Sequence, residues 1–221
     1  MLLAAGPTLS HGTYRFPKDT KPKCLFHYEG KVLLERAVRV LRKCGLNDIR
    51  IVVGYKKELI EKFNNKKKLG LKLIYNPTGG SDTHGGGWKK GSDSIRLGLN
   101  GIDEDVIIAV GDIYLTEKGL STLLRSKDRL IIGWGGHGFQ MFKIGKEYLP
   151  KLRKAEGRGC PRLIYNFCMT QKGVMGFNKK DGVYKGSREL FMKHYLVLPG
   201  IKDIDWYWQT DEGKREGVKR R

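Results

Sequence analysis

The sequence predicts an α/β fold of three layers, in which a mostly parallel, mixed β-sheet lies between two layers of helices. Short apolar runs typical of buried strands alternate with amphipathic segments over residues 1–135. At roughly ten residues, the amphipathic segments are long enough to return the chain for another parallel strand. Right-handed crossovers of this kind place helices on both faces of the sheet.

The first elements have clear boundaries in the sequence. An apolar run at 2–5 predicts a short buried strand, and the prolines and glycines of 7–23 predict a loop. Apolar side chains at helical spacing predict an amphipathic helix over 32–44, which Gly45 ends. The β-branched run at 49–53 then predicts the second buried strand.

The same alternation continues through the middle of the chain. A short helix is predicted over 57–63 and a third strand over 71–75. The many glycines of 76–92 predict a long loop, and a loop of that length in a compact domain is usually functional or mobile. A helix over 92–99 and an apolar strand over 105–110 follow.

The pattern remains clear as far as residue 135 and then weakens. A helix is predicted over 117–125 and a strand over 129–134. Beyond that point the expected strands cover 139–144, 163–169, 174–177 and 196–199, and the expected helices cover 146–155 and 188–195. We expect a single domain over 1–208, followed by a basic, frayed tail over 209–221.

Composition limits the class of partner and the compartment. The net charge of +20 indicates anionic partners, either nucleic acid or a nucleoside triphosphate together with a phosphorylated acceptor. The four cysteines lack CxxC spacing, which favours free thiols in a reducing compartment. No apolar run reaches the roughly eighteen residues of a membrane span, and no signal peptide is recognisable. We therefore expect a cytoplasmic protein without a membrane span.

The first loop has the composition of a phosphate-binding segment. The strand at 2–5 leads directly into Gly6, and Gly12 lies further along the loop. Backbone N–H groups of glycines approach phosphate oxygens closely because no Cβ intervenes. Arg15 and Lys23 add fixed positive charge, which a polyphosphate requires when it loses water.

The ends of the predicted strands carry the remaining chemistry. The loops after Ala5 and Tyr75 and the turn at Asp112 all fall at carboxyl ends of parallel strands, where ligands bind in open sheets. Asp112 offers a carboxylate of the kind that binds Mg²⁺. The alternative is that Gly111 and Asp112 form a plain turn with no role in metal binding. Asp203 and Asp205 would share one side of a strand, either as further ligands or as a solvent-exposed edge.

These segments resemble the nucleotidyltransferases that join a nucleoside triphosphate to a sugar phosphate or a phospho-alcohol, including the small cytidylyltransferases. The string LAAG at 3–6, GTYRFP at 12–17 and KPK at 21–23 match the opening signature of that family. Further matches are the turn into a helix at 29–36, the second strand at 45–55, the metal-binding strand end at 111–115 and the acidic element at 203–205. The resemblance implies a Rossmann-like nucleotidyltransferase fold, of the glycosyltransferase A type, and a function in making activated small molecules such as nucleotide sugars.

The resemblance also implies roles for individual residues. It places Lys23 on the α-phosphate and Arg15 on the β- and γ-phosphates. It makes Mg²⁺ the cofactor, with Asp112, Asp203 and Asp205 as its ligands. The residues that would bind the nucleotide are Leu3, Ala4, Ala5, Gly6, Gly12, Asn76, Ser92 and Ser94. Ser92 equally suits the N-cap of the helix that follows it, and the two roles are compatible.

Several alternatives remain open from the sequence. The acceptor is either a sugar 1-phosphate or a phospho-alcohol such as phosphocholine. The aromatic run Trp206-Tyr207-Trp208 suits core or oligomer packing, a wall of an acceptor pocket, or a cage for a quaternary ammonium group. The competing functions are a glycosyltransferase that uses a nucleoside-diphosphate sugar and a basic nucleic-acid-binding protein. An oligomer is compatible with the sequence.

Overall fold

A computed structural model describes residues 1–4, 21–78, 91–135, 138–156, 160–172, 175–178, 183–186, 195–203 and 209–217. Its centre is a seven-stranded sheet with the strand order β12-β8-β9-β6-β1-β4-β5. The strands are β1 (Leu2–Ala4), β4 (Arg50–Val53), β5 (Lys72–Tyr75), β6 (Val106–Val110), β8 (Leu130–Gly135), β9 (Gly138–Ile144) and β12 (Tyr195–Val197). Only β9 runs antiparallel to its neighbours in this sheet, so the predicted mostly parallel, mixed sheet is confirmed.

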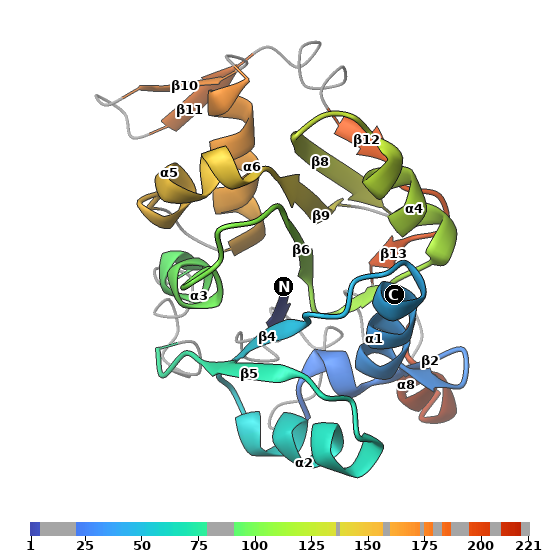
Figure 1. Ribbon diagram of the computed structural model, residues 1–221. Helices are drawn as coiled ribbons and strands as arrows, with labels where there is room; N and C mark the ends of the chain where they lie inside the picture. Colours follow the sequence, from blue (N-terminus) through green and yellow to red (C-terminus); the bar gives the residue numbers. More distant parts are fainter. Residues whose placement is uncertain are drawn as a thin grey trace.

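Helices cover both faces of the sheet, as Figure 1 shows. The helices are α1 (Leu33–Lys43), α2 (Lys57–Lys67), α3 (Gly91–Gly98), α4 (Glu117–Arg125), α5 (Leu149–Arg153), α6 (Cys160–Gln171) and α8 (Asp211–Arg215). One apolar cluster joins α1, α2 and α4 to the sheet, and a second joins α3, α5 and α6 to its other face. The two clusters on opposite faces confirm the three-layer arrangement expected from the crossovers.

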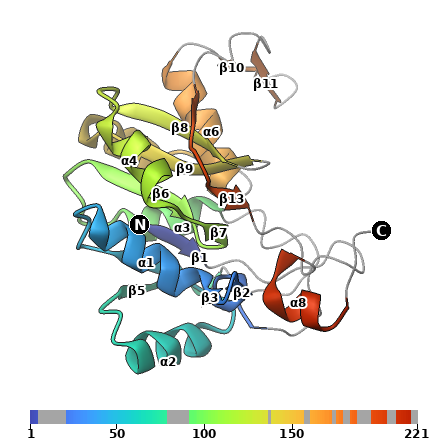
Figure 2. The same cartoon turned by 90° about the vertical axis from the view of Figure 1, so that its right-hand side faces the viewer.

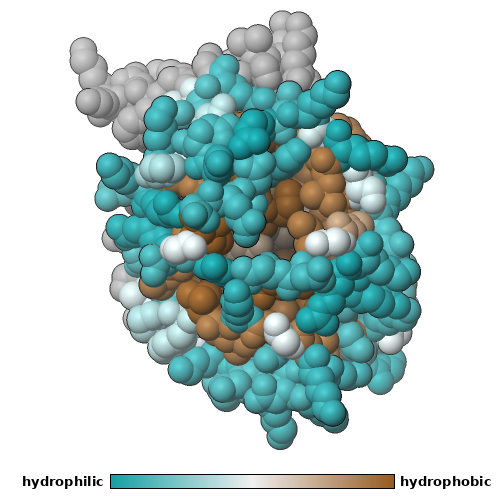
Figure 3. Space-filling model, in the orientation of Figure 1, coloured by the Kyte–Doolittle hydropathy of each residue, from teal (hydrophilic) through white to brown (hydrophobic). Residues whose placement is uncertain are grey.

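The first amphipathic helix illustrates why the sequence forms these layers. In α1 the side chains at 33, 34, 37, 38, 40 and 41 are buried, whereas Arg39 is exposed. This spacing forms one apolar stripe, and burying it against the sheet stabilises the helix more than its intrinsic propensity does. On the face shown in Figure 3, hydrophilic residues accordingly form the outline and hydrophobic residues are visible towards the centre.

Within the described residues, three short strand pairs lie outside the main sheet. They are β2 (His27–Tyr28) with β3 (Lys31–Val32), β7 (Ile113–Tyr114) with β13 (Lys202–Asp203), and β10 (Met175–Asn178) with β11 (Val183–Gly186), and all are antiparallel. Glu29 and Gly30 form the turn between β2 and β3 with positive φ angles of 52° and 73°. Positive φ at both positions is typical of the tight turns that suit a hairpin's twist.

The C-terminal part of the chain returns to the edge of the sheet near the first hairpin. β12 pairs in parallel with β8, and β13 pairs with β7. Thr116 fixes this return, because its hydroxyl donates to the Pro199 carbonyl oxygen at 2.8 Å and accepts from the Gly119 N–H at 3.1 Å. Figure 2 shows β2, β3, β13 and α8 to the right of β1, on the side toward which β1 runs.

Two expectations from the sequence differ from the structure. Residues 163–169 were expected as a strand, but they lie within α6, where Leu163, Ile164, Phe167 and Cys168 are buried at helical spacing. A short apolar run does not distinguish a strand from a buried helix, and the helical period decides here. The expected frayed tail is helical over Asp211–Arg215, because contacts with the first hairpin order it.

Several expected features fall outside the described residues. The aromatic run at 206–208 and most of the helix expected at 188–195 belong to this group. Within the described ranges, no helix combines the length and the apolar character that crossing a bilayer requires.

Candidate active site

The carboxyl ends of β1 and β6 are in close contact and define the first part of the site. Leu3 pairs with Val110, and the Gly111 N–H donates to the Leu3 carbonyl oxygen at 2.9 Å. A Cβ at Gly111 would lie 3.0 Å from both the Ala4 Cβ and the Leu3 carbonyl oxygen. Glycine therefore allows β1 and the end of β6 to approach closely, and this approach places Asp112 beside the end of β1.

Lys23 faces Asp112 across this point. Lys23 begins the 3₁₀ helix η1 (Lys23–Leu25), and its Nζ lies 3.1 Å from Oδ2 of Asp112. Their side chains are 24% and 23% exposed, so both groups remain accessible to a ligand while water screens them only partly. The structure thus brings together two of the predicted catalytic residues from distant parts of the sequence.

The neighbouring thiol is not available for chemistry at neutral pH. Cys24 is fully buried beside this ion pair. Burial, together with the negative charge of Asp112, raises the pKa of the Cys24 thiol to about 12. A thiol that stays protonated is a poor nucleophile and a poor metal ligand, so the reactive groups at this position are the lysine and the carboxylate.

The predicted C-terminal acidic segment approaches the same point. In the β7–β13 pair, Lys202 lies opposite Tyr114 and Asp203 lies opposite Ile113. The backbone of Asp203 is therefore next to the residue that follows Asp112. The remaining predicted residues of this part of the site, Ala5, Gly6, Gly12, Arg15 and Asp205, lie outside the described residues.

A second polar group lies at the carboxyl end of β5. Asn76 is 1% exposed, and its amide donates to the Ser94 hydroxyl at 2.8 Å. The Asn76 Oδ1 accepts from the N–H and the hydroxyl of Thr78, at 3.0 and 2.8 Å, and the Thr78 hydroxyl also lies 3.2 Å from Asp93. These bonds fix the start of the loop after β5 against α3.

The sequence predicted Asn76, Ser92 and Ser94 as nucleotide contacts, and the structure shows how they are held. Asn76 and Ser94 bond to each other, and Ser92 is buried in the first turn of α3, which begins at Gly91 and not after Ser92. Thr78 completes this group. Thr78 was not predicted from the sequence, because its only signal is its place two residues after Asn76.

An aromatic and ionic cluster supports the β7–β13 pair. The Tyr114 hydroxyl donates to Glu29 at 2.6 Å, and this hydrogen bond holds the pKa of the Glu29 carboxyl below its usual range. Arg36 lies 3.8 Å from the centre of the Tyr114 ring, and Tyr28 packs edge-on against Tyr114 with ring centres 5.0 Å apart. Lys202 bonds to both Glu29 and the Tyr28 hydroxyl, so β13 is tied to the first hairpin.

The C-terminal helix α8 holds the segment that precedes Lys23. Glu212 accepts from Nζ of Lys21 and from Nδ1 of His27, each at 2.7 Å. Burial favours the protonated form of Glu212, but the hydrogen bonds from Lys21 and His27 outweigh burial and lower its pKa to about 2. Asp211 accepts from the backbone N–H of Glu29 and Gly30. No sequence pattern signalled these contacts, which join residues far apart in the chain.

The described residues fit a metal ion only in combination with a substrate. No three His, Cys, Asp or Glu side chains gather into a metal-binding group within the part of the chain that the structure describes. Mg²⁺ needs only one or two protein carboxylates when phosphate oxygens and water complete its octahedron. Asp112, half-buried at a strand end near the backbone of Asp203, has the chemistry of such a ligand.

A comparison against known families bears on the whole domain. Residues 1–171 match the model of the MobA-like NTP transferase domain. The chain belongs to this family. Lys23, Asp112, Asn76 and Ser94 all lie within the matched residues of the NTP transferase domain, and the resemblance noted in the sequence is confirmed.

Two curated relatives of this NTP transferase domain are cytidylyltransferases. Choline-phosphate cytidylyltransferase of Streptococcus pneumoniae is 38% identical over 77 residues, which are 34% of this chain and 31% of that protein. CTP:phosphoglutamine cytidylyltransferase of Campylobacter jejuni is 28% identical over 137 residues, which are 60% of this chain and 50% of that protein. The chain therefore spans half or less of the length of these two curated relatives.

A solved structure shows the same fold over almost the whole chain. The CTP:phosphocholine cytidylyltransferase of Streptococcus pneumoniae superposes with a TM-score of 0.61 at 17% identity, covering 99% of this chain and 97% of that one. This similarity confirms the predicted Rossmann-like nucleotidyltransferase fold of the NTP transferase domain.

Proposed function

We propose that this protein is a Mg²⁺-dependent nucleotidyltransferase, which transfers a nucleoside monophosphate from a nucleoside triphosphate to a phosphorylated small molecule. The observation that carries the proposal is the 3.1 Å pair of Lys23 and Asp112 at the ends of β1 and β6. Phosphoryl chemistry needs a cation that binds phosphate and a carboxylate that binds a metal ion, and this pair supplies both. Membership of the NTP transferase family supports the same reaction.

In the proposed reaction, an oxygen of the acceptor phosphate attacks the α-phosphorus of the triphosphate. The bond from the α-phosphorus to the bridging oxygen breaks, and pyrophosphate leaves. Lys23 exchanges Asp112 for an α-phosphate oxygen and stabilises the charge that develops there. The acceptor phosphate is already anionic, so the reaction requires no protein base to remove a proton.

Asp112 is the central metal ligand in this proposal, with Asp203 and Asp205 as further ligands. A bound Mg²⁺ would neutralise phosphate charge and orient the two substrates. Arg15 would contact the β- and γ-phosphates, so binding energy from the leaving group would align the α-phosphorus. The fit rests on the chemistry of Asp112 and on the place of Asp203 opposite Ile113.

The nucleotide would lie along the ends of β1 and β5. Backbone groups of Leu3 and Ala4 and the loop segments with Gly6 and Gly12 would hold it, and the Asn76–Ser94 pair would position the base-binding loop. CTP is the proposed donor, because two of the three curated relatives that match this chain are cytidylyltransferases. The proposed acceptor is a phospho-alcohol or a sugar 1-phosphate.

The proposed compartment is the cytoplasm, where nucleoside triphosphates are abundant. Three cysteines in the described ranges, Cys24, Cys44 and Cys168, are free thiols, which supports a reducing compartment.

Release of pyrophosphate tests the proposal. The protein is incubated with Mg²⁺, one of the four common nucleoside triphosphates, and either phosphocholine, glucose 1-phosphate or no acceptor. Release that requires both substrates, and is greatest with CTP, supports the proposal. Turnover of a nucleoside-diphosphate sugar, with no pyrophosphate from any triphosphate, would identify a glycosyltransferase instead.

A further inference from the structure

A groove of about 670 Å³ lies between α1 and α2, below the first hairpin. Among the residues that the structure describes, seven lysine and arginine side chains line it, and Glu35 is the single carboxylate. Lys23 and Asp112 are not among its described lining residues, whereas Lys21 and Leu25 are, so the groove adjoins the candidate active site without including its ion pair. Cations held close together repel one another, so this excess of positive charge in the groove disfavours the folded state unless an anion binds there.

The wall formed by α2 carries three of these cations. Lys62 and Lys66 are one helical turn apart, so their side chains share a face of α2, and Lys67 follows them. Like charges at this spacing destabilise an isolated helix. Lys62 and Lys66 are both exposed, and neither makes an ion pair within the described ranges. Figure 3 shows the lower edge of the molecule, which α2 forms in Figure 1, as mostly hydrophilic.

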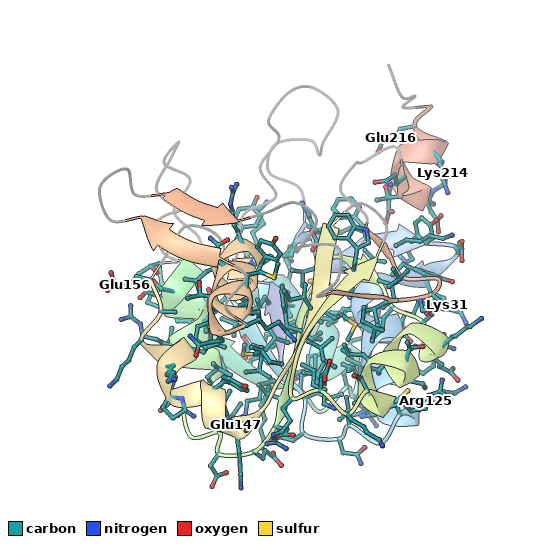
Figure 4. All side chains as sticks on the ribbon, turned by 90° about the horizontal axis from the view of Figure 1, so that it is seen from above. Lys31, Arg125, Glu147, Glu156, Lys214 and Glu216 are labelled. Carbon is teal, nitrogen blue, oxygen red and sulfur yellow. The ribbon has the colours of Figure 1, made fainter. Side chains whose placement is uncertain are left out.

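The opposite wall presents arginines and a hairpin lysine. Arg36 and Arg39 reach the groove from α1, and Lys31 reaches it from β3. Lys31 makes no ion pair with any other described residue. Glu35 pairs with Lys67 at 3.2 Å, so this contact joins α1 to α2 and occupies the one carboxylate among the described residues of the groove. In Figure 4, Lys31 lies on the same side of the molecule as Lys214 of α8.

Apolar side chains form the remaining surface of the groove. Leu25 and Val32 are buried there, and Phe63 is half-buried. Apolar surface beneath a cationic rim lowers the local dielectric and strengthens the attraction of an anion to the rim. The groove therefore has two walls of fixed positive charge and a floor that excludes part of the solvent.

We infer that this groove is a second anion site, which binds a small ligand with several phosphate groups. Its volume lies within the range of about 300–1,000 Å³ that small-molecule pockets occupy. Several cations on two facing walls match a ligand with several anionic groups better than a single phosphate. The inference concerns a site separate from Lys23 and Asp112, so it does not depend on the proposed nucleotidyl transfer.

The test uses inorganic tripolyphosphate and isothermal titration calorimetry at low salt. The protein carries Lys23→Ala, so that binding at the candidate active site is weakened. The groove variant adds Lys62→Ala and Lys66→Ala, which remove two exposed side chains without opening the core. The matched control adds Lys118→Ala and Lys127→Ala, two exposed lysines away from the groove, and changes the net charge equally.

The inference predicts that the groove variant binds tripolyphosphate roughly tenfold more weakly, and that the control binds it unchanged. Equal weakening in both variants would show that only net charge matters, and would overturn the inference. An absence of binding in the Lys23→Ala protein would overturn it too. A single-stranded oligoribonucleotide is titrated in parallel. If Lys62 and Lys66 affect its affinity and not that of tripolyphosphate, the groove is a nucleic-acid site and the inference is wrong.

Circular dichroism and thermal unfolding check that each variant is folded. Lys62→Gln with Lys66→Gln provides a second groove variant, which keeps a polar side chain and a similar helix propensity and removes the two charges. The same loss of affinity is expected for it. For the activity control, the same Lys62 and Lys66 substitutions are made in the protein that keeps Lys23. Pyrophosphate release with CTP is expected to stay unchanged in these proteins, because neither Lys62 nor Lys66 lies in the proposed catalytic machinery.

Discussion

Lys23 and Asp112 form an ion pair of 3.1 Å between the 3₁₀ helix η1 and the turn after β6. Each is held by a different part of the fold. Asp112 is fixed because Gly111 lets the end of β6 contact Leu3. Lys23 follows Lys21, which Glu212 of the C-terminal helix binds. The geometry of the pair therefore depends on contacts among the beginning, the middle and the end of the described chain.

Gly111→Ala tests the close approach of β1 and β6. The added Cβ would lie 3.0 Å from Ala4 Cβ and from the Leu3 carbonyl oxygen, and neither is the end of a flexible side chain. We expect a loss of about 1–3 kcal/mol in the free energy of unfolding, typical of overpacking. Urea denaturation measures it. Wild-type stability in the variant would show that the strand ends have room to separate.

The elements that carry the site could be predicted from the sequence, whereas the long-range contacts that hold it could not. β1, α1 and β6 follow from local apolar patterns, because burial of one face determines each of them. The turn at Asp112 follows from its place after an apolar strand. The ion pairs of Glu212 do not follow from the sequence, because no local pattern encodes a contact between residues so far apart.

The errors in the sequence analysis have the same origin. The run at 163–169 is rich in apolar residues, a composition that is typical of a strand. The helical spacing of its buried positions becomes evident only in the structure. The polar composition of 211–215 indicated a solvated tail, yet its carboxylates bind the N–H groups of the turn at Glu29 and Gly30. Tertiary contacts, and not propensity, order both segments.

Glu212 should make stability depend on pH in the acidic range. Its pKa is about 2 in the folded protein and 4.5 in the reference state. The unfolded state therefore binds the proton more tightly, and the stabilisation by Glu212 is fully present above about pH 5 and lost as the pH falls towards 2. After allowance for solvent screening, we expect a contribution of about 1–2 kcal/mol at pH 7.

Glu212→Gln tests this dependence. Urea unfolding at several pH values from 7 to 3 should show a smaller decline in stability for the variant than for the wild-type protein. Glu61→Gln, at an exposed position of α2, is the control and should follow the wild-type curve. Parallel curves for all three proteins would show that Glu212 stays equally accessible to protons in both states.

The hydrogen-bonded group at the end of β5 predicts a coupling between Asn76 and Ser94. Asn76→Ala leaves the Ser94 hydroxyl and the Thr78 N–H without their partner, and buried unsatisfied groups of this kind cost about 1–3 kcal/mol. A double-mutant cycle with Ser94→Ala, measured by urea unfolding, should give a non-additive term. Strict additivity would mean that the two side chains act independently.

The hydroxyl of Tyr114 predicts a small effect on stability. Tyr114→Phe removes its hydrogen bond to Glu29 and keeps the ring that Arg36 contacts. We expect a loss of about 0.5–1.5 kcal/mol in the free energy of unfolding. Tyr75→Phe is the matched control, because Tyr75 is 49% exposed and its ring also contacts a cationic side chain, that of Lys57. Losses of equal size would assign the effect to the aromatic substitution itself.

The central claim is that Asp112 and Lys23 form the catalytic centre of a nucleotidyltransferase. Pyrophosphate release by the Asp112→Asn protein tests it most directly, because asparagine keeps the shape and removes the charge. With circular dichroism showing a folded variant, kcat/KM for CTP should fall by at least roughly a hundredfold. Release at the wild-type rate by the folded variant would contradict the claim.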